Sequence, residues 1–486
     1  MRVCQIAAEV TPFAKTGGLG DVAAGLSRYL GREGHDVRVF LPFYGQLARQ
    51  PERFIPPFIP VDFLQELPLR MGPRHFTFSV LTAKLPDSEV DVYFIACPPL
   101  FAQEGIYQGD LADGLRFALL TRAAFECCQR MGWGPDIVHC HDWHTALAPI
   151  YVKALYSWDR LFDHTRSVLT IHNMAFQGYL PGSAAGDFGL SEYGHWLDGY
   201  DQAAGTFNVL KTGLLHADVI TAVSRTYAQE IQTPEQGFGL DWLLRARSNR
   251  LIGIVNGMDY GEWDPATDPH LPHHYSAGDL AGKREMKRTL LRETGLEDTD
   301  APVVGIVSRL TAQKGFDLAF EALPAVLARR DFRVIALGSG EPRYEDFFQW
   351  LQWRFAGRAW FYKGFHNPLA HWIEAGADIF LMPSRYEPCG LNQMYSLRYG
   401  TPPIVRKTGG LADTVEPFDP ARQEGTGFVF EHFTAEGLRW ALDTALDACQ
   451  DRAGWERLMR NGMAKDFSWD VQGREYVDLY RRLTGL

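Results

Sequence analysis

The sequence predicts an α/β protein with two doubly wound domains, each a parallel sheet covered by helices. A chain of 486 residues is too long for one ordinary hydrophobic core and calls for two or three domains. Short apolar strands alternate with helical stretches in both halves, which is typical of parallel sheets with helical crossovers. The strands are apolar on both sides, so we expect both faces of each sheet to be buried.

The first half begins with a strand over 2–9 and a helix over 18–34, whose apolar residues recur at helical spacing. A second long helix is expected near 113–131. The remaining strands of this half are expected at 35–42, 135–142, 167–173, 217–224 and 250–257.

The second half repeats this order more regularly, with a helix over 316–330 after its first strand. Between the two halves, residues 261–300 are rich in Pro, Asp and His and are the best candidate for a linker. The strands of the second half are expected at 301–309, 332–340, 360–364, 378–384, 402–406 and 425–430.

A last helix is expected over 467–483, and its sequence is amphipathic. Trp469, Tyr476 and Tyr480 fall on one side of it. Packing against a hydrophobic core is the role that this pattern predicts.

The composition narrows the classes of function. A net charge of −11 disfavours nonspecific binding to nucleic acid or to an anionic membrane. No apolar run approaches the ~18 residues that a membrane span needs, and MRVCQIAAEV is interpreted as a strand rather than a leader. The seven cysteines form no CxxC pair, so neither a disulfide framework nor a zinc site is predicted. We expect a cytoplasmic protein.

Polar residues follow several of the predicted strands, and the carboxyl ends of the two sheets are expected to face one cleft. The first such loop is KTGGLGD, residues 15–21. Gly17 and Gly18 let a ligand approach the backbone at the start of a helix, where amides bind phosphate. Lys15 adds a positive charge and Asp21 an acceptor for hydroxyls. Glycines that serve packing alone would explain this loop about as well.

Two further loops carry side chains that suit sugar hydroxyls. HCHDWH, residues 139–144, contains Asp142 and an indole that could cover a pyranose ring. His172 and Asn173 lie at the end of the next strand along the chain. A metal site and histidines hydrogen-bonded in the core are the alternatives, of which the second explains one or two of the histidines.

The second half supplies the cations that an acidic protein needs to hold a diphosphate. Arg309 and Lys314 lie five residues apart across one turn and can reach a single anionic group, although a solvated surface pair is the alternative. Glu387 precedes a turn that opens a helix. Backbone amides of that turn can hold phosphate, and the Glu387 carboxylate can bond sugar hydroxyls. No histidine lies close in sequence to activate a nucleophilic cysteine there, so a contact or packing thiol is favoured. The turn consists of Cys389, Gly390, Leu391 and Asn392.

Together these motifs resemble the bacterial and plant glycogen and starch synthases over essentially the whole chain. The shared motifs, in order, are KTGGLGD, HCHDWH, TIHNMAFQG, VNGMD with Asn256, SRLTAQKG, PSRYEPCGLNQ and TGGLADTV. The resemblance implies a GT-B fold of two Rossmann-like domains flanking a deep cleft, with the last helix returning to the first domain. The implied domains are 1–258, 259–465 and this C-terminal helix, 466–486.

The resemblance also implies an activity. These enzymes transfer glucose from ADP-glucose to the 4-hydroxyl at the non-reducing end of an α-1,4-glucan, such as glycogen or a maltooligosaccharide, with retention of configuration. The resemblance implies no metal, no other cofactor, and neither a nucleic-acid nor a membrane partner. The sequence leaves the oligomeric state open.

The family's site residues carry over onto matching positions. Lys15 resembles the donor-binding lysine, with the Gly18 amide near the diphosphate and Asp142 and His172 beside the sugar. Arg309 and Lys314 resemble the clamp on the leaving phosphates, and Glu387 resembles the glutamate that binds the transferred glucose. Phe365 falls where the family has an aromatic residue against adenine, and Tyr395 where other retaining transferases have a second glutamate.

Two other functions fit less well. Another retaining GT-B glucosyltransferase would use a different nucleotide donor, such as UDP-glucose, or a small acceptor. A glucan-binding protein without activity predicts that the site residues are eroded, and they are all present. A second copy of the glycine-rich motif, KTGGLAD at 407–413, follows another predicted strand. We expect its glycines to serve close backbone packing, and Lys407 to be dispensable.

Overall fold

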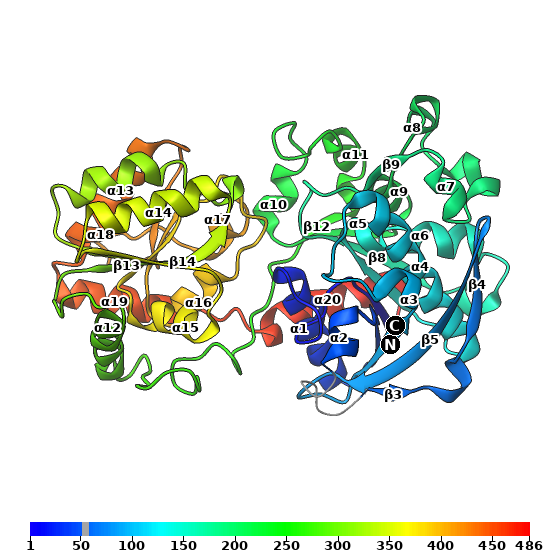
Figure 1. The fold of residues 1–486 in the computed structure, drawn as a ribbon, viewed down its shortest axis with the longest axis horizontal. Helices are drawn as coiled ribbons and strands as arrows, with labels where there is room; N and C mark the ends of the chain where they lie inside the picture. The colour runs from blue at the N-terminus through cyan, green and yellow to red at the C-terminus, as the bar shows by residue number, and fades with distance from the viewer. Residues whose placement is uncertain (51–57) are drawn as a thin grey trace. The chain divides into compact units, whose positions relative to one another are not determined.

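The computed structural model describes residues 1–50 and 58–486, which form two sheets of mainly parallel strands with helices packed on them. The chain divides into two units, each with its own sheet (Figure 1). Unit 1 comprises Met1–Gly257 and Trp469–Leu486, and unit 2 comprises Met258–Ser468. No helix in the described part of the chain is long and apolar enough to cross a membrane.

The sheet of unit 1 is parallel over seven neighbouring strands and antiparallel at one end. Its central strands, β7, β1 and β8, are almost wholly buried, as expected for strands covered on both faces. In spatial order the parallel strands are β12 (Leu251–Gly253), β11 (Val219–Ala222), β8 (Arg166–Ile171), β7 (Ile137–His141), β1 (Arg2–Ile6), β2 (Asp36–Pro42) and β6 (Asp91–Ala96). The antiparallel end consists of β5 (Arg74–Lys84), β3 (Ile59–Pro60) and β4 (Leu67–Met71).

The first helix of unit 1, α1 (Gly18–Arg32), begins directly after the glycine-rich loop. Gly34, just after the helix, terminates it by adopting a left-handed φ of 81°. The next residue, His35, donates a backbone hydrogen bond to Leu30 O at 3.0 Å. The other α-helices before the C-terminal segment are α2 (Gly45–Arg49), α3 (Pro98–Phe101), α4 (Asp110–Arg130), α5 (Asp142–Thr145), α6 (Ala148–Ile150), α7 (Ala184–Asp187), α8 (Gly199–Ala204), α9 (Val209–His216), α10 (Arg225–Glu230) and α11 (Asp241–Ala246). A small antiparallel pair is formed by β9 (Tyr179–Pro181) and β10 (Thr206–Asn208).

The last helix, α20 (Trp469–Thr484), belongs to unit 1 although the preceding two hundred residues do not. Its predicted apolar side is confirmed, since Tyr476 and Tyr480 are fully buried and Trp469 is 8% exposed. The Trp469 indole lies so close to Gly25 and Gly257 that neither position has room for a Cβ. Small residues on the partner elements therefore fix where α20 docks.

Replacing Trp469 by alanine should destabilise unit 1 by about 3–5 kcal/mol, because it leaves a cavity where the indole packs on Gly25 and Gly257. The free energy of unfolding from chemical denaturation followed by circular dichroism measures this. Val471→Ala is the matched control on the same helix, where the side chain is 39% exposed, and it should cost less than about 1 kcal/mol. Equal effects of the two substitutions would contradict the assigned docking.

Unit 2 contains a sheet of six strands that are all parallel. Helices α13, α14 and α18 lie on one side of the sheet and α12, α15 and α19 on the other (Figure 1). In spatial order the strands are β15 (Ala359–Lys363), β14 (Arg333–Gly340), β13 (Val303–Leu310), β16 (Ile379–Met382), β17 (Pro403–Arg406) and β18 (Phe428–Phe430). The α-helices are α12 (Ala281–Glu293), α13 (Ala319–Leu327), α14 (Pro342–Arg354), α15 (Asn367–Gly376), α16 (Asn392–Arg398), α17 (Gly409–Thr414), α18 (Ala435–Ala448) and α19 (Arg452–Met463).

The prediction of a linker over 261–300 is wrong. Leu271, Tyr275 and Leu280 are buried in the core of unit 2, and α12 occupies the middle of this segment. Its Pro, Asp and His residues suggest a solvated loop, but the few apolar residues between them anchor it. The antiparallel strands β3 to β5 were also not predicted from the sequence.

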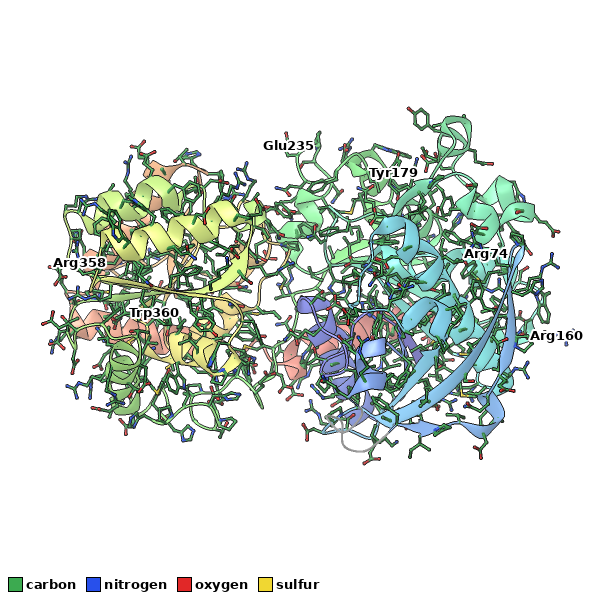
Figure 2. All side chains as sticks on the ribbon, viewed as in Figure 1. Arg74, Arg160, Tyr179, Glu235, Arg358 and Trp360 are labelled. Atoms are coloured by element: carbon green, nitrogen blue, oxygen red, sulfur yellow. The ribbon has the colours of Figure 1, made fainter. Side chains whose placement is uncertain are left out.

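Side chains fill the space between sheet and helices in both units (Figure 2). In unit 2, the guanidinium of Arg358 donates to Leu327 O at 2.7 Å, which ties the start of β15 to the end of α13. Trp360, also labelled in Figure 2, is partly buried and packs against a core cluster that includes Leu369 and Ile373 of α15. The polar residues considered next follow the carboxyl ends of the strands, outside these cores.

Candidate functional site

Glu9, which is 3% exposed, holds the glycine-rich loop of unit 1 through hydrogen bonds. Its carboxylate accepts hydrogen bonds from the backbone amides of Thr16 and Gly17, at 2.6 and 3.1 Å, and from the Thr16 hydroxyl at 2.7 Å. The Tyr107 hydroxyl donates to the same carboxylate. Gly17 and Gly18 then lead into α1, whose start has no side-chain cap. An uncapped helix start at an exposed glycine is a suitable place for an anion.

Lys15 and Asp21 of the predicted site contact each other. The Lys15 ammonium lies 2.8 Å from Asp21 Oδ1, with 46% of the lysine side chain exposed. The Thr11 hydroxyl donates to the same oxygen at 2.9 Å. Exposed ion pairs are weak, so a ligand phosphate can replace the carboxylate as the partner of Lys15.

Asp142 lies between the ends of β7 and β8, which are parallel neighbours. Its Oδ1 accepts from the backbone amides of His172 at 2.7 Å and Asn173 at 3.2 Å. The backbone of Asp142 is left-handed, with φ of 50°, a conformation that aspartate tolerates better than most residues. Burial raises the pKa of Asp142 to about 7, against the opposing effect of these two hydrogen bonds. The structure thus brings three of the predicted residues together.

A row of histidine rings lies next to this carboxylate. His172 Nε2 is 3.1 Å from His141 Nδ1, and His141 Nε2 is 3.1 Å from Gln5 Oε1. His139 bonds instead to the Tyr480 hydroxyl at 2.7 Å and the Thr170 hydroxyl at 2.6 Å. Burial lowers the pKa of His141 to about 3 and that of His172 well below its usual value, so both rings are neutral.

The predicted role of Trp143 as a platform for a pyranose is wrong. The indole is 3% exposed and packs against Gly178, where a Cβ has no room. An indole at a strand end gains more by joining the core than by facing solvent. The next residue, His144, is partly exposed, and its ring stacks on that of Tyr107 at 4.9 Å between centroids.

Unit 2 brings Lys314 and Glu387 together. The Lys314 ammonium lies 2.7 Å from Glu387 Oε2, and the Ser384 hydroxyl donates to the same oxygen at 2.9 Å. Glu387 is 5% exposed, so this is a nearly buried pair. Arg309 is exposed near the end of β13, and its guanidinium has no hydrogen bond or ion pair among the described residues. The arrangement provides one cation held by a carboxylate and one available to an anion.

The turn after Glu387 leads into α16. Cys389 is buried, Gly390 is left-handed with φ of 77°, and Leu391 and Asn392 are partly exposed. The Asn392 amide donates to Val307 O at 3.0 Å, which fixes the start of the helix against β13. Cys389 is thus a packing thiol by its burial.

The second glycine-rich copy supports this turn. Gly410 N donates to Glu387 O at 3.1 Å and Pro388 O at 3.2 Å. A Cβ on Gly409 would meet the backbone of Glu387, and a Cβ on Gly410 would meet that of Cys389. In the described part of the chain, the Lys407 ammonium pairs only with Glu431, at 2.8 Å, and both side chains are well exposed. The glycines therefore serve close packing around Glu387.

Gly410→Ala should lower turnover by about tenfold or more, since its Cβ would push the backbone of residues 387–389 away from the position that holds Glu387. Initial rates under saturating substrate measure the loss. Lys407→Ala is the matched control from the same heptapeptide and should leave the rate within about twofold, because an exposed pair contributes little. A larger loss from Lys407→Ala than from Gly410→Ala would reverse these assignments.

Two further predicted residues differ in exposure. Phe365 is 83% exposed in the segment after β15. Asn256 is 4% exposed at the end of unit 1, and its Oδ1 is buried without a hydrogen-bond partner in the described part of the chain. No group of three or more His, Cys, Asp or Glu side chains among the described residues could hold a metal ion.

Sequence reasoning missed Glu9, Tyr107 and Ser384. Ser384 stands three residues before Glu387, and Glu9 is a lone carboxylate directly after the first apolar strand. An acid at the end of a buried strand is a signal that the sequence did offer. Tyr107 gave none, since nothing in its segment links it to Glu9.

Residues 2–246 match the family model of the starch synthase catalytic domain, and residues 287–460 match that of glycosyl transferases group 1. The chain belongs to the glycogen and starch synthase family. Glycogen synthases similar to it include that of Koribacter versatilis (strain Ellin345), 44% identical over 99% of this chain and 98% of the relative. That of Myxococcus xanthus (strain DK1622) is 47% identical over 99% of both chains.

A solved glycogen and starch synthase structure has the same fold. The catalytic domain of starch synthase IV from Arabidopsis thaliana, bound to ADP and acarbose, matches with a TM-score of 0.90 and 34% identity, over 100% of this chain and 99% of that one. The predicted GT-B fold is confirmed. Sucrose-phosphate synthase from Thermosynechococcus elongatus shares the fold at a TM-score of 0.62 and 15% identity, over 100% and 99% of the two chains.

Proposed function

We propose that this glycosyltransferase moves glucose from ADP-glucose to the 4-hydroxyl at the non-reducing end of an α-1,4-glucan, elongating glycogen with retention of configuration. The observation that carries the proposal is the nearly buried Lys314–Glu387 pair, in a chain of the glycogen and starch synthase family. Arg309 adds an exposed guanidinium that has no partner among the described residues. The choice of ADP is supported by the related starch synthase IV, which was solved with ADP bound.

The chemistry follows from where charge develops. Breaking the bond between the anomeric carbon and the phosphate oxygen leaves a cationic sugar and a diphosphate that gains negative charge. Arg309 and Lys314 stabilise that charge, as fixed cations do most effectively where water is excluded. Within unit 1, Lys15 and the uncapped start of α1 are further positive groups that suit an anion. These charges come from the chain itself, so the proposal includes no metal and no further cofactor.

Retention follows from attack on the same face of the sugar. The acceptor 4-hydroxyl forms the new bond to the anomeric carbon as the phosphate leaves, and its proton passes to the departing phosphate oxygen. A double displacement would need a free carboxylate as the nucleophile, with a second one ~5 Å away. Glu387 is bound to Lys314 and Ser384, which favours a role in holding sugar hydroxyls over one as a nucleophile.

Asp142, His172 and Asn173 are the proposed sugar contacts of unit 1. Asp142 Oδ1 is occupied by two backbone amides, while a carboxylate has further lone pairs for hydroxyls. A cytoplasmic location belongs to the proposal as well, because all seven cysteines are free thiols, as a reducing compartment maintains.

The test is incorporation of labelled glucose into polymer. The protein is incubated with ADP-glucose or UDP-glucose and either glycogen or a maltooligosaccharide. The proposal predicts incorporation from ADP-glucose with both acceptors and a much lower rate from UDP-glucose. Transfer that prefers UDP-glucose, or a small acceptor over either glucan, would instead support another retaining GT-B glucosyltransferase. No incorporation from either donor would contradict both.

A further inference from the structure

Gln5, His141 and His172 form a line of hydrogen-bonded side chains from three neighbouring strands or strand ends of unit 1. Gln5 lies on β1, His141 ends β7, and His172 follows β8. Gln5 and His141 are 0% exposed, and two contacts of 3.1 Å connect the three side chains. Only the last member, His172, is partly exposed.

The carbonyl oxygen of Gln5 gives this line a direction. An amide oxygen only accepts, so His141 Nε2 carries the hydrogen and donates to Gln5 Oε1. A neutral imidazole has one N–H, which leaves His141 Nδ1 as an acceptor. His172 Nε2 must then donate to it. The remaining nitrogen of His172, Nδ1, keeps its lone pair.

That lone pair is available to a ligand. His172 Nδ1 has no hydrogen-bond partner within residues 1–50 and 58–486. The atom is not fully buried, so a ligand can reach it. The backbone amide of His172 is bound to Asp142, so the residue is fixed beside a proposed sugar-binding carboxylate. An acceptor with fixed orientation at this position suits a sugar hydroxyl.

The neighbouring His139 does not disturb this order. Its ring packs on that of His141 at 4.3 Å between centroids, but both its nitrogens are engaged by Tyr480 and Thr170. Gln5 leaves its own Nε2 buried without a hydrogen-bond partner in the described part of the chain. A buried amide whose N–H groups lack a partner is costly, so the role of Gln5 is the hydrogen bond that its oxygen accepts from His141.

We infer that Gln5 and His141 are positioning residues that hold His172 in its Nε2–H tautomer, so that Nδ1 accepts a hydrogen bond from a hydroxyl of the transferred glucose. This rests on the proposed function for its substrate, but the tautomer itself belongs to the free protein. Neither Gln5 nor His141 touches the reacting atoms; both act through His172.

The direct test is the ring ¹⁵N spectrum of the full-length protein labelled at histidine, with the His172 signals assigned through His172→Gln. The inference predicts a neutral ring with its hydrogen on Nε2. A hydrogen on Nδ1, a charged ring, or an even mixture of tautomers would overturn it. No turnover is involved, so this result is independent of whether ADP-glucose is the donor.

Three variants connect the tautomer to activity. Gln5→Leu and His141→Leu should mix the tautomers of His172 and lower kcat by about tenfold or more, the loss expected when one oriented hydrogen bond is lost. His141→Asn returns an amide oxygen near the position of Nδ1 and should restore most of the rate and the single tautomer. If His141→Asn is as impaired as His141→Leu while both stay folded, the role is one of packing and the inference fails.

Tyr480→Phe is the matched control. It removes the hydrogen bond to His139 in the same buried cluster but leaves the line from Gln5 to His172 intact. The tautomer and kcat should both stay unchanged, whatever the effect on stability. A loss of kcat equal to that of Gln5→Leu would show that any damage to this core lowers the rate, which contradicts the specific role. Absence of glucose transfer by the wild-type protein would refute the proposed function and leave the spectrum as the test of the tautomer.

Discussion

Replacing Lys314 or Glu387 by alanine is expected to lower turnover by about 10²–10³-fold, the loss typical of removing one fixed group that stabilises developing charge. Lys314 would no longer balance the charge that the leaving diphosphate gains. Glu387 would no longer hold the transferred sugar or orient the lysine, whose ammonium lies 2.7 Å from it. Initial rates of glucose incorporation at saturating donor and glucan measure both effects.

Stability must be followed alongside these rates. Removing Lys314 leaves Glu387 nearly buried beside Ser384 without its cation, which is costly to the folded state. The double variant Lys314→Met with Glu387→Gln removes both charges and should fold better than Lys314→Ala while staying inactive. Rates within tenfold of the wild type in folded single variants would refute the roles assigned to this pair.

Asp142→Asn should make the protein more stable at pH 8 and at least a hundredfold less active. Burial raises the pKa of Asp142 to about 7, from an ordinary value of 3.8, so the folded protein favours the protonated form. The stability this group contributes is fully present below pH 4 and is lost as the pH rises through 7. At pH 8 an amide avoids a cost of about 4 kcal/mol, and its oxygen can still accept from His172 and Asn173.

Activity should respond in the opposite sense, because an ionised Asp142 is the stronger acceptor for sugar hydroxyls. The wild-type rate is expected to rise with pH through about 7, and the residual rate of Asp142→Asn should lack that step. Denaturation curves at pH 5 and pH 8, with a pH–rate profile, measure the two effects. An asparagine variant that is less stable than the wild type at pH 8, or fully active, would contradict this account of the carboxylate.

The sequence predicted the two parallel sheets because their strands are apolar runs flanked by glycine-rich or polar turns. The antiparallel end of unit 1 escaped because β5 alternates polar and apolar residues between segments that were not assigned. Residues 261–300 were misassigned since composition cannot show that three apolar side chains, at 271, 275 and 280, reach a core. Short-range patterns predict elements well and long-range packing poorly.

The site shows the same division. Lys314 and Glu387 are separated by 73 residues in the sequence. Both were predicted as site residues from the position of their motifs, and their direct contact was not predicted. Trp143 was misjudged, because a strand end in the sequence does not say whether an indole turns inward or outward. Gln5 was overlooked although a glutamine inside the apolar run RVCQI is a local contradiction, and such contradictions often mark function.

The anomeric configuration of the new glucosidic bond tests the central claim most directly. After extension of a maltooligosaccharide with ADP-glucose carrying ¹³C in the sugar, the NMR signal of the transferred anomeric carbon identifies its configuration and its linkage. We predict an α linkage to the 4-hydroxyl of the non-reducing end, formed before any other product. A β linkage, attachment at another hydroxyl, or labelled free glucose in place of polymer would contradict it.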